Sequence, residues 1–154
     1  MIVVQEQDFD LASVYQALRE EAGDPGAIVT FTGLVRELYD QNSDSSKPVT
    51  GLFLEHYPGM TEKCLEDIAQ QARDKWPLQA LCIIHRVGDL KPGDQIVLVG
   101  AASAHRHAAF EAAQFMMDYL KSKAPFWKKQ RGEDGAEWVA SRHSDAEAIA
   151  RWQK

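Results

Sequence analysis

The chain has 154 residues, of which 45% are apolar and 26% are charged, and its formal net charge is −6. This composition is typical of a soluble globular protein, and we expect residues 1–154 to form a single domain around one core. The acidic balance argues against a surface that binds nucleic acid broadly, although a local basic patch can still hold a small anion.

The termini and cysteines bear on the compartment. The first ten residues, MIVVQEQDFD, lack the basic and long apolar parts of a secretion signal, and no apolar run approaches the length of a membrane span. We therefore expect a cytoplasmic protein without membrane contact. Cys64 and Cys82 lie in apolar contexts without a CxxC spacing, which predicts buried free thiols.

The first half of the chain alternates between strand and helix patterns. Segments rich in β-branched and other apolar residues predict strands at 2–4, 27–35 and 49–57. Segments with apolar side chains at helical spacing predict helices at 9–22 and 61–76. Thr61 is the predicted N-cap of the second of these helices. Polar and turn-forming residues at 37–48 predict a surface loop.

The second half predicts a strand pair, a longer helix and a hairpin. ALCIIHRV and QIVLVGAA flank the Gly/Pro turn GDLKPGD, which predicts two strands. A helix over roughly 105–123 turns apolar side chains inward. FWKKQR and AEWVA, joined by GEDG, predict a hairpin before a last helical segment. Because strands and helices do not alternate strictly, the pattern predicts an α+β fold.

Four lysines lie within nine positions around the end of the long helix: Lys121, Lys123, Lys128 and Lys129. Like charges this close repel, so the cluster suggests a bound anion. Taken alone, Lys121 is better explained as a cation that complements the helix dipole, with Asp118 as its partner. Lys128 and Lys129 face opposite sides of a strand, so one of them should face the helix end.

The start of the same helix carries His105, Arg106 and His107, where the helix dipole disfavours cations. A bound phosphate or carboxylate would offset this, because helix N-terminal N–H groups and an arginine both attract anions. Equally, Arg106 could reach a distant carboxylate while the histidines stay neutral. Histidines two apart on a helix diverge, so we expect no metal site. Arg36, at the end of a predicted strand, is a third candidate.

Several segments together carry a family resemblance: VTFTGLVR (29–36), LEHYPGMTEK (54–63), IIHRVGDLKPGD (83–94), SAHRHAAFEAAQFMMDYLKSKAPFWKK (103–129) and Trp138. They resemble the large, catalytic subunit of molybdopterin synthase, the MoaE family, over nearly the whole chain. The resemblance implies an α+β fold with an α/β-hammerhead-type core and an additional small antiparallel β region. It also implies a homodimer that binds a small ubiquitin-like, MoaD-like carrier subunit at each end, giving a heterotetramer.

The resemblance implies a sulfurtransferase that needs no cofactor. The C-terminal Gly-Gly thiocarboxylate of the carrier would donate sulfur to cyclic pyranopterin monophosphate, forming the dithiolene of molybdopterin. By the resemblance, the catalytic lysines are Lys121 and Lys128. The implied substrate contacts are Leu34, Val35, Arg36, His105, Arg106, Lys121, Lys128, Lys129 and Gln130. The sequence departs from the family pattern at Leu34, where relatives can carry a basic residue, and at Lys129-Gln130, which replaces an Arg-Glu pair.

From the residues alone, two other functions stay open. The chain could be a non-catalytic anion-binding or scaffolding module whose lysines only dock an acidic C-terminus. It could also bind single-stranded nucleic acid, with Phe126 and Trp127 as stacking platforms among the lysines. The second function is disfavoured, because aromatic residues after a helix-ending proline more often anchor a core or an interface.

Overall fold

The computed structural model describes residues 1–36, 49–132, 135–139 and 143–153. Its centre is a four-stranded sheet in the order β1-β4-β6-β2. The strands are β1 (Ile2–Gln5), β4 (Leu78–Arg86), β6 (Gln95–Ser103) and β2 (Ala27–Leu34). β1 runs parallel to β4, whereas the β4–β6 and β6–β2 pairs are antiparallel. The strands predicted at 2–4 and 27–35 correspond to β1 and β2, and their bounds agree within one residue.

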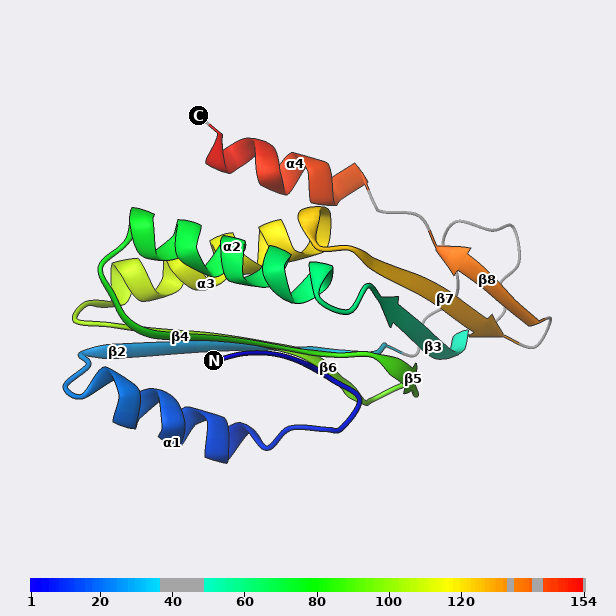
Figure 1. Cartoon of the computed structure of the whole chain (residues 1–154), viewed down its shortest axis with the longest axis horizontal. Coiled ribbons are helices and arrows are strands. Elements are labelled where there is room, and N and C mark those ends of the chain that lie inside the picture. The colour runs from blue at the N-terminus through cyan, green and yellow to red at the C-terminus, as the bar shows by residue number, and fades with distance from the viewer. Residues whose placement is uncertain (37–48, 133–134, 140–142, 154) are drawn as a thin grey trace.

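Helices cover both faces of this sheet, which explains why β4 and β6 are apolar over most of their length. In Figure 1, α1 (Leu11–Ala22) lies on one face, and α2 (Met60–Lys75) and α3 (Arg106–Lys123) lie side by side on the other. Along β4, Leu81 and Ile83 join the core under α2 and α3, while Cys82 and Ile84 join the core that packs on α1. This alternation sets which way each later residue of β4 points.

A second, smaller sheet extends from one end of the first (Figure 1). Its order is β5-β3-β7-β8, and every pair is antiparallel. The strands are β5 (Gly88–Leu90), β3 (Val49–His56), β7 (Phe126–Gly132) and β8 (Gly135–Val139). The predicted hairpin is therefore confirmed, and the predicted turn between β4 and β6 contributes a strand of its own. The two sheets with their helices confirm the α+β class.

The last helix, α4 (His143–Trp152), packs on the outer side of α3 (Figure 1). The Trp152 ring meets the rings of Trp76 and Phe115 edge-on, with centroids 5.7 and 5.5 Å apart. The Trp152 indole N–H donates to the Asp118 carboxylate at 2.7 Å, and Arg151 lies 3.4 Å from the same oxygen. The Asp118 carboxylate therefore binds Trp152 and Arg151 of α4, whereas the sequence predicted Lys121 as its partner.

Some predicted boundaries were wrong. Thr61 is not the N-cap of α2, because Gly59 takes that position with φ of +87° and the helix begins at Met60. The Glu62 carboxylate accepts from the Gly59 N–H and closes the first turn. A positive φ is available to glycine at little cost, which lets the chain enter the helix earlier than Thr61. The predicted loop at 37–48 lies outside the described residues.

Candidate active site

Lys121 lies where the long helix meets the second sheet. α3 ends at Lys123, as predicted, and Ala124 is extended (φ −77°, ψ 133°) ahead of Pro125. The residue before a proline is restricted in this way by contact with the proline ring, so the sequence itself stops the helix here. β7 then begins at Phe126, only five residues after Lys121. The junction therefore carries Lys121 and the first residues of β7 into one region.

Lys128, not Lys129, faces this region. The Phe126 ring stacks on the ring of His85, with centroids 3.8 Å apart and planes 17° apart. Alternate residues of a strand share a face, so Lys128 lies on the same side of β7 as Phe126. Trp127 is on the other side, where its ring meets that of Tyr57 edge-on at 4.4 Å. The strand alternation thus selects one lysine of the predicted pair.

His85 stacks on Phe126, two residues before Lys128, and the charges of both lysines act on it. It is 5% exposed, and burial lowers its pKa to about 4. The positive charges of Lys128, Lys121 and His56 lower the pKa of His85 further, so all three groups act on this imidazole. His85 Nδ1 is 2.8 Å from the carbonyl oxygen of Arg86, a contact that opposes the lowering. At neutral pH the ring is therefore uncharged, and we call Lys121 and Lys128 around it the two-lysine site.

Thr61 connects the segments that frame the two-lysine site. Its hydroxyl is completely buried, accepts from the Tyr57 N–H at 3.0 Å and donates to the Pro125 carbonyl at 3.2 Å. The start of α2 is thereby joined to the junction between α3 and β7. Nearby, His56 lies 3.4 Å from the Glu62 carboxylate. The framework is held by buried polar contacts as well as by apolar packing.

The end of β2 reaches the same part of the fold. Val35 is buried in a cluster with Leu54, and Leu54 is the β3 residue opposite Lys128. The Val35 N–H donates to the Asp94 carbonyl at 2.9 Å. Arg36 and Leu34 on either side of it are exposed. The backbone therefore brings the end of β2 close to the part of β3 that pairs with Lys128.

The start of α3 is far from the two-lysine site. His105 is the N-cap, in an extended conformation, and its side chain makes no capping hydrogen bond. Arg106 is the first helical residue and is exposed. It stands 15 positions before Lys121, and at about 1.5 Å per residue this places the two roughly 22 Å apart along the helix. Within one chain, His105 and Arg106 therefore do not join Lys121 and Lys128 around a small ligand.

The last two predicted contacts lie on β7 beyond Lys128. Lys129 pairs with Phe53 and Trp138 in the sheet register and belongs to the opposite face of the strand. Gln130 pairs with Leu52, which returns it to the face of Lys128. Its side chain lies outside the description. Of these two positions, only Gln130 shares the face of the two-lysine site.

Three further features of the described residues are possible metal ligands, helices that could span a membrane, and thiols. Among the described residues, no group of three or more His, Cys, Asp or Glu side chains could hold a metal ion. The described helices include none that is long and apolar enough to cross a membrane. Both cysteines are free thiols, as predicted, although Cys64 is only half-buried. Burial raises the pKa of Cys82 to about 11, which keeps this thiol protonated and unreactive.

Sequence reasoning missed His85, His56 and Thr61. The histidine interrupts an otherwise apolar strand, ALCIIHRV, and a titratable residue in such a run is a recognisable signal. The other two carry no local signal, because their roles depend on residues far away in the sequence. Thr61 and Pro125 are 64 positions apart.

Comparison with known proteins defines the family. Residues 4–123 match the model of the MoaE protein family, and the chain belongs to that family. It is 51% identical to the molybdopterin synthase catalytic subunit of Vibrio cholerae, over 99% of this chain and 97% of the relative. It is 52% identical to that of Escherichia coli, over 98% and 97% of the two chains. The structure of the MoaE protein from Burkholderia ambifaria superposes with a TM-score of 0.84 at 46% identity, covering 100% of this chain and 98% of that one.

Proposed function

We propose that the chain is a sulfurtransferase, acting as the catalytic subunit of a molybdopterin synthase in molybdenum cofactor biosynthesis. Besides membership of the MoaE family, one observation carries the proposal. Lys121 lies in the last turn of α3 and Lys128 on β7, and the charges of both act on one uncharged imidazole, His85, which stacks on Phe126 of β7. Two cations held together in this way suit a reaction in which two anions must meet.

The proposed donor is the C-terminal Gly-Gly thiocarboxylate of a small ubiquitin-like, MoaD-like carrier subunit. The proposed acceptor, cyclic pyranopterin monophosphate, carries a phosphate, so donor and acceptor repel each other in solution. Two ammonium groups offset that repulsion at short range. The transfer occurs twice and forms the dithiolene of molybdopterin.

The two lysines have different roles in this proposal. Lys121 lies at the exposed end of α3, where it orients the thiocarboxylate or acts as general acid or base once a bound carrier excludes water. Lys128 is half-buried on β7 and stabilises the negative charge that develops on the attacked centre. Neither step passes sulfur through Cys64 or Cys82. The protonated state of Cys82 supports this assignment.

The remaining proposed contacts divide into two groups. Five belong to segments near the two-lysine site in the same chain: Leu34, Val35 and Arg36 at the end of β2, and Lys129 and Gln130 on β7. His105 and Arg106 lie roughly 22 Å from Lys121 by the helix rise, farther than a small substrate spans. We propose a homodimer in which Arg106 of one copy serves the substrate phosphate beside the two-lysine site of the other. With one carrier bound at each end, the assembly is a heterotetramer.

The carrier would dock against exposed apolar residues where β3, α2 and β7 meet, next in the chain to the segment that carries Lys128. Tyr57 and Met60 lie between β3 and the start of α2, and Trp127 lies next to Lys128; they are 53%, 60% and 39% exposed. Aromatic and methionine side chains are enriched in the centres of protein interfaces. The net charge of −6 and the small extent of the basic patch give no support to nucleic-acid binding. We propose a cytoplasmic location.

The test is a reconstituted reaction. The chain is incubated with thiocarboxylated carrier and cyclic pyranopterin monophosphate, and dithiolene product is detected after conversion to a fluorescent derivative. We expect product only when all three components are present, and none with a carrier that ends in an ordinary carboxylate. Carrier binding without product would support a scaffolding module and contradict the proposal.

A further inference from the structure

His85 is a buried titratable side chain that the proposed chemistry does not use. Leu81 and Ile83 of β4 face the core under α2 and α3, and the alternation of the strand turns His85 to that same side. It sits at the end of the strand, where the apolar core gives way to the two lysines. A histidine at 5% exposure in such a place needs a reason beyond filling space.

The imidazole is held on two sides. Its Nδ1 lies 2.8 Å from the Arg86 carbonyl, and its face lies against the Phe126 ring at 3.8 Å. When Nδ1 carries the proton, it donates to this carbonyl and Nε2 is left as a hydrogen-bond acceptor. Both contacts fix the plane of the ring.

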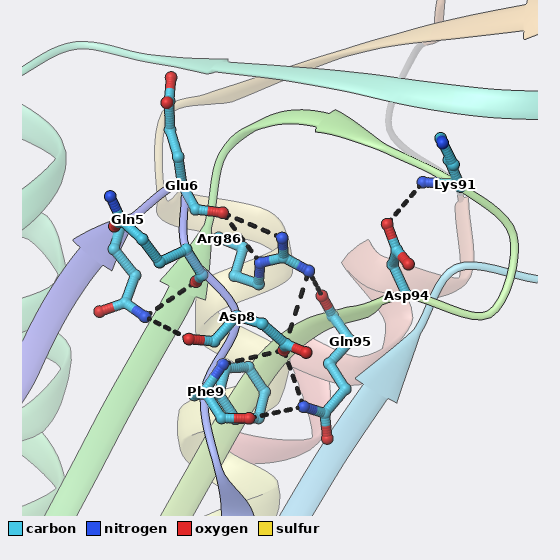
Figure 2. A network of polar contacts seen from close by, with 9 residues as sticks. Gln5, Glu6, Asp8, Phe9, Arg86, Lys91, Asp94 and Gln95 are labelled. Atoms are coloured by element: carbon cyan, nitrogen blue, oxygen red, sulfur yellow. Dashed lines mark hydrogen bonds and ion pairs between the residues drawn. The ribbon is translucent and has the colours of Figure 1, made fainter.

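The residue that supplies the carbonyl is itself fixed. Figure 2 shows the Arg86 guanidinium between two segments of main chain. It donates to the Glu6 carbonyl from Nε and Nη2, at 3.1 and 3.0 Å, and to the Gln95 carbonyl from Nη1 at 2.9 Å. Asp8 lies 3.8 Å away, and its own pKa is lowered chiefly by a hydrogen bond from Gln95. These hydrogen bonds join the end of β4 to β6 and to the residue after β1. They therefore fix the position of the Arg86 carbonyl, the acceptor for His85.

The charges around the imidazole come from four elements. Lys121 approaches from α3, Lys128 from β7 and His56 from β3, while Glu62 of α2 faces His56 at 3.4 Å. Three of these four groups are cationic or can become so. A proton on His85 would add another positive charge beside both lysines and drive them apart.

We propose that His85 is a positioning residue of the two-lysine site. The ring is held between the Arg86 carbonyl and Phe126, and it determines the position of Lys128 relative to Lys121. Phe126 transmits the position, because it is two residues from Lys128 on the same face of β7. The inference rests on the proposed function of the two lysines.

The test compares His85→Ala, His85→Phe and the matched control Ile84→Ala. Ile84 is the neighbouring buried residue of β4 and faces α1, so its truncation leaves a cavity in the same strand on the other side of the sheet. In sulfur transfer by the folded fraction, we expect His85→Ala to lower kcat by about tenfold or more with little change in KM for the pterin. His85→Phe keeps an uncharged ring against Phe126 and should recover most of the activity. Ile84→Ala should keep kcat near the parental value.

A second readout does not depend on sulfur transfer. Lys121 and Lys128 are acetylated with an amine-reactive ester, and the two rates are followed by peptide mass spectrometry in the absence of substrates. We expect the ratio of the rates to change by about twofold or more in His85→Ala and to stay constant in Ile84→Ala. Parental kcat and a parental ratio in folded His85→Ala would overturn the inference, as would a His85→Phe variant as impaired as His85→Ala. If the parent transfers no sulfur, the proposed function fails, and the acetylation ratio still decides the role of His85.

Discussion

The two ends of α3 use cationic residues in different ways. At the C-terminal end, Lys121 complements the helix dipole, and its charge, like that of Lys128, lowers the pKa of His85. At the N-terminal end, Arg106 opposes the dipole and is exposed, and it meets no part of the two-lysine site within the chain. Lys121 is thus favoured by its own helix and also acts on a residue of another element, His85. Arg106 is disfavoured by the local structure, and the proposed function assigns the substrate phosphate to it.

The largest effect is expected at Lys121. Lys121→Ala should lower sulfur transfer by about 10²- to 10⁴-fold, the usual contribution of a positioned acid or base. Lys121→Arg should be nearly as impaired, because arginine keeps the charge but cannot lose a proton. Product formation with saturating carrier and pterin is the measurement.

Lys123→Ala is the matched control for Lys121, since Lys123 is an exposed cation in the same last turn of α3. Both substitutions to alanine should cost only about 0.3–1 kcal/mol of folding stability through the helix dipole. Near-parental turnover by Lys121→Ala would remove this residue from the mechanism. The role of Lys121 would then be limited to complementing the dipole of α3.

Because His85 is uncharged in the folded chain, the stability of the region around the C-terminal end of α3 should depend on pH. Its pKa is about 4 in the folded chain against an ordinary value of 6.5, so between these values the unfolded chain binds a proton that the folded chain does not. The free energy of unfolding contributed by this site should be intact above pH 6.5 and fall as pH drops toward 4, by up to about 3 kcal/mol. Urea unfolding at several pH values measures it.

His85→Phe isolates the effect, because every other titrating group is present in both proteins. The variant should lose less stability than the parent between neutral pH and about pH 4. Equal losses in the two proteins would show that His85 does not resist protonation.

Strand alternation separates Lys128 from Lys129. Lys128→Ala should lower turnover by about 10- to 100-fold, the worth of a hydrogen bond to a charged group, because this lysine shares the face of Phe126 and His85. Lys129→Ala, on the opposite face, should have a smaller effect. Steady-state kinetics of both variants compare the two sides of β7, and equal losses would contradict the selection of Lys128.

The smallest effect is expected at the other end of α3. Arg106→Ala should weaken binding of the pterin substrate about tenfold through loss of one charge-assisted contact, with carrier affinity unchanged. His107→Ala is the control, since His107 is an exposed neighbour that lies 3.0 Å from Glu111. Isothermal titration of the assembled dimer with each ligand makes the measurement. If the Arg106→Ala variant binds the pterin with unchanged affinity, Arg106 does not contact the substrate phosphate.

Much of the local structure followed from the sequence. Periodicity located the helices and most strands, and Pro125 marked where α3 must stop. The same alternation rule showed that Lys128 and Lys129 cannot share a face, although it did not say which one turns inward. The segments 29–36, 54–63, 83–94 and 103–129, together with Trp138, carried the family resemblance.

The two-lysine site depended on pairings between distant residues. Nothing local shows that Phe126 stacks on His85, 41 positions earlier, or that the Thr61 hydroxyl reaches Pro125. The placement of β3 and β5 in a second sheet was equally hidden, because strand patterns specify a buried face but not a partner strand. These pairings form when loops close and apolar faces find one another.

By itself, the sequence determined where the helices and most of the strands lie, where α3 ends, and that cations gather at both of its ends, because these depend on residues a few positions apart. Only the tertiary structure decided that Lys128, and not Lys129, shares a face of β7 with Phe126, and that Phe126 stacks on a buried, neutral His85. Those outcomes depend on burial and on sheet register, which bring together residues that no short stretch of sequence contains.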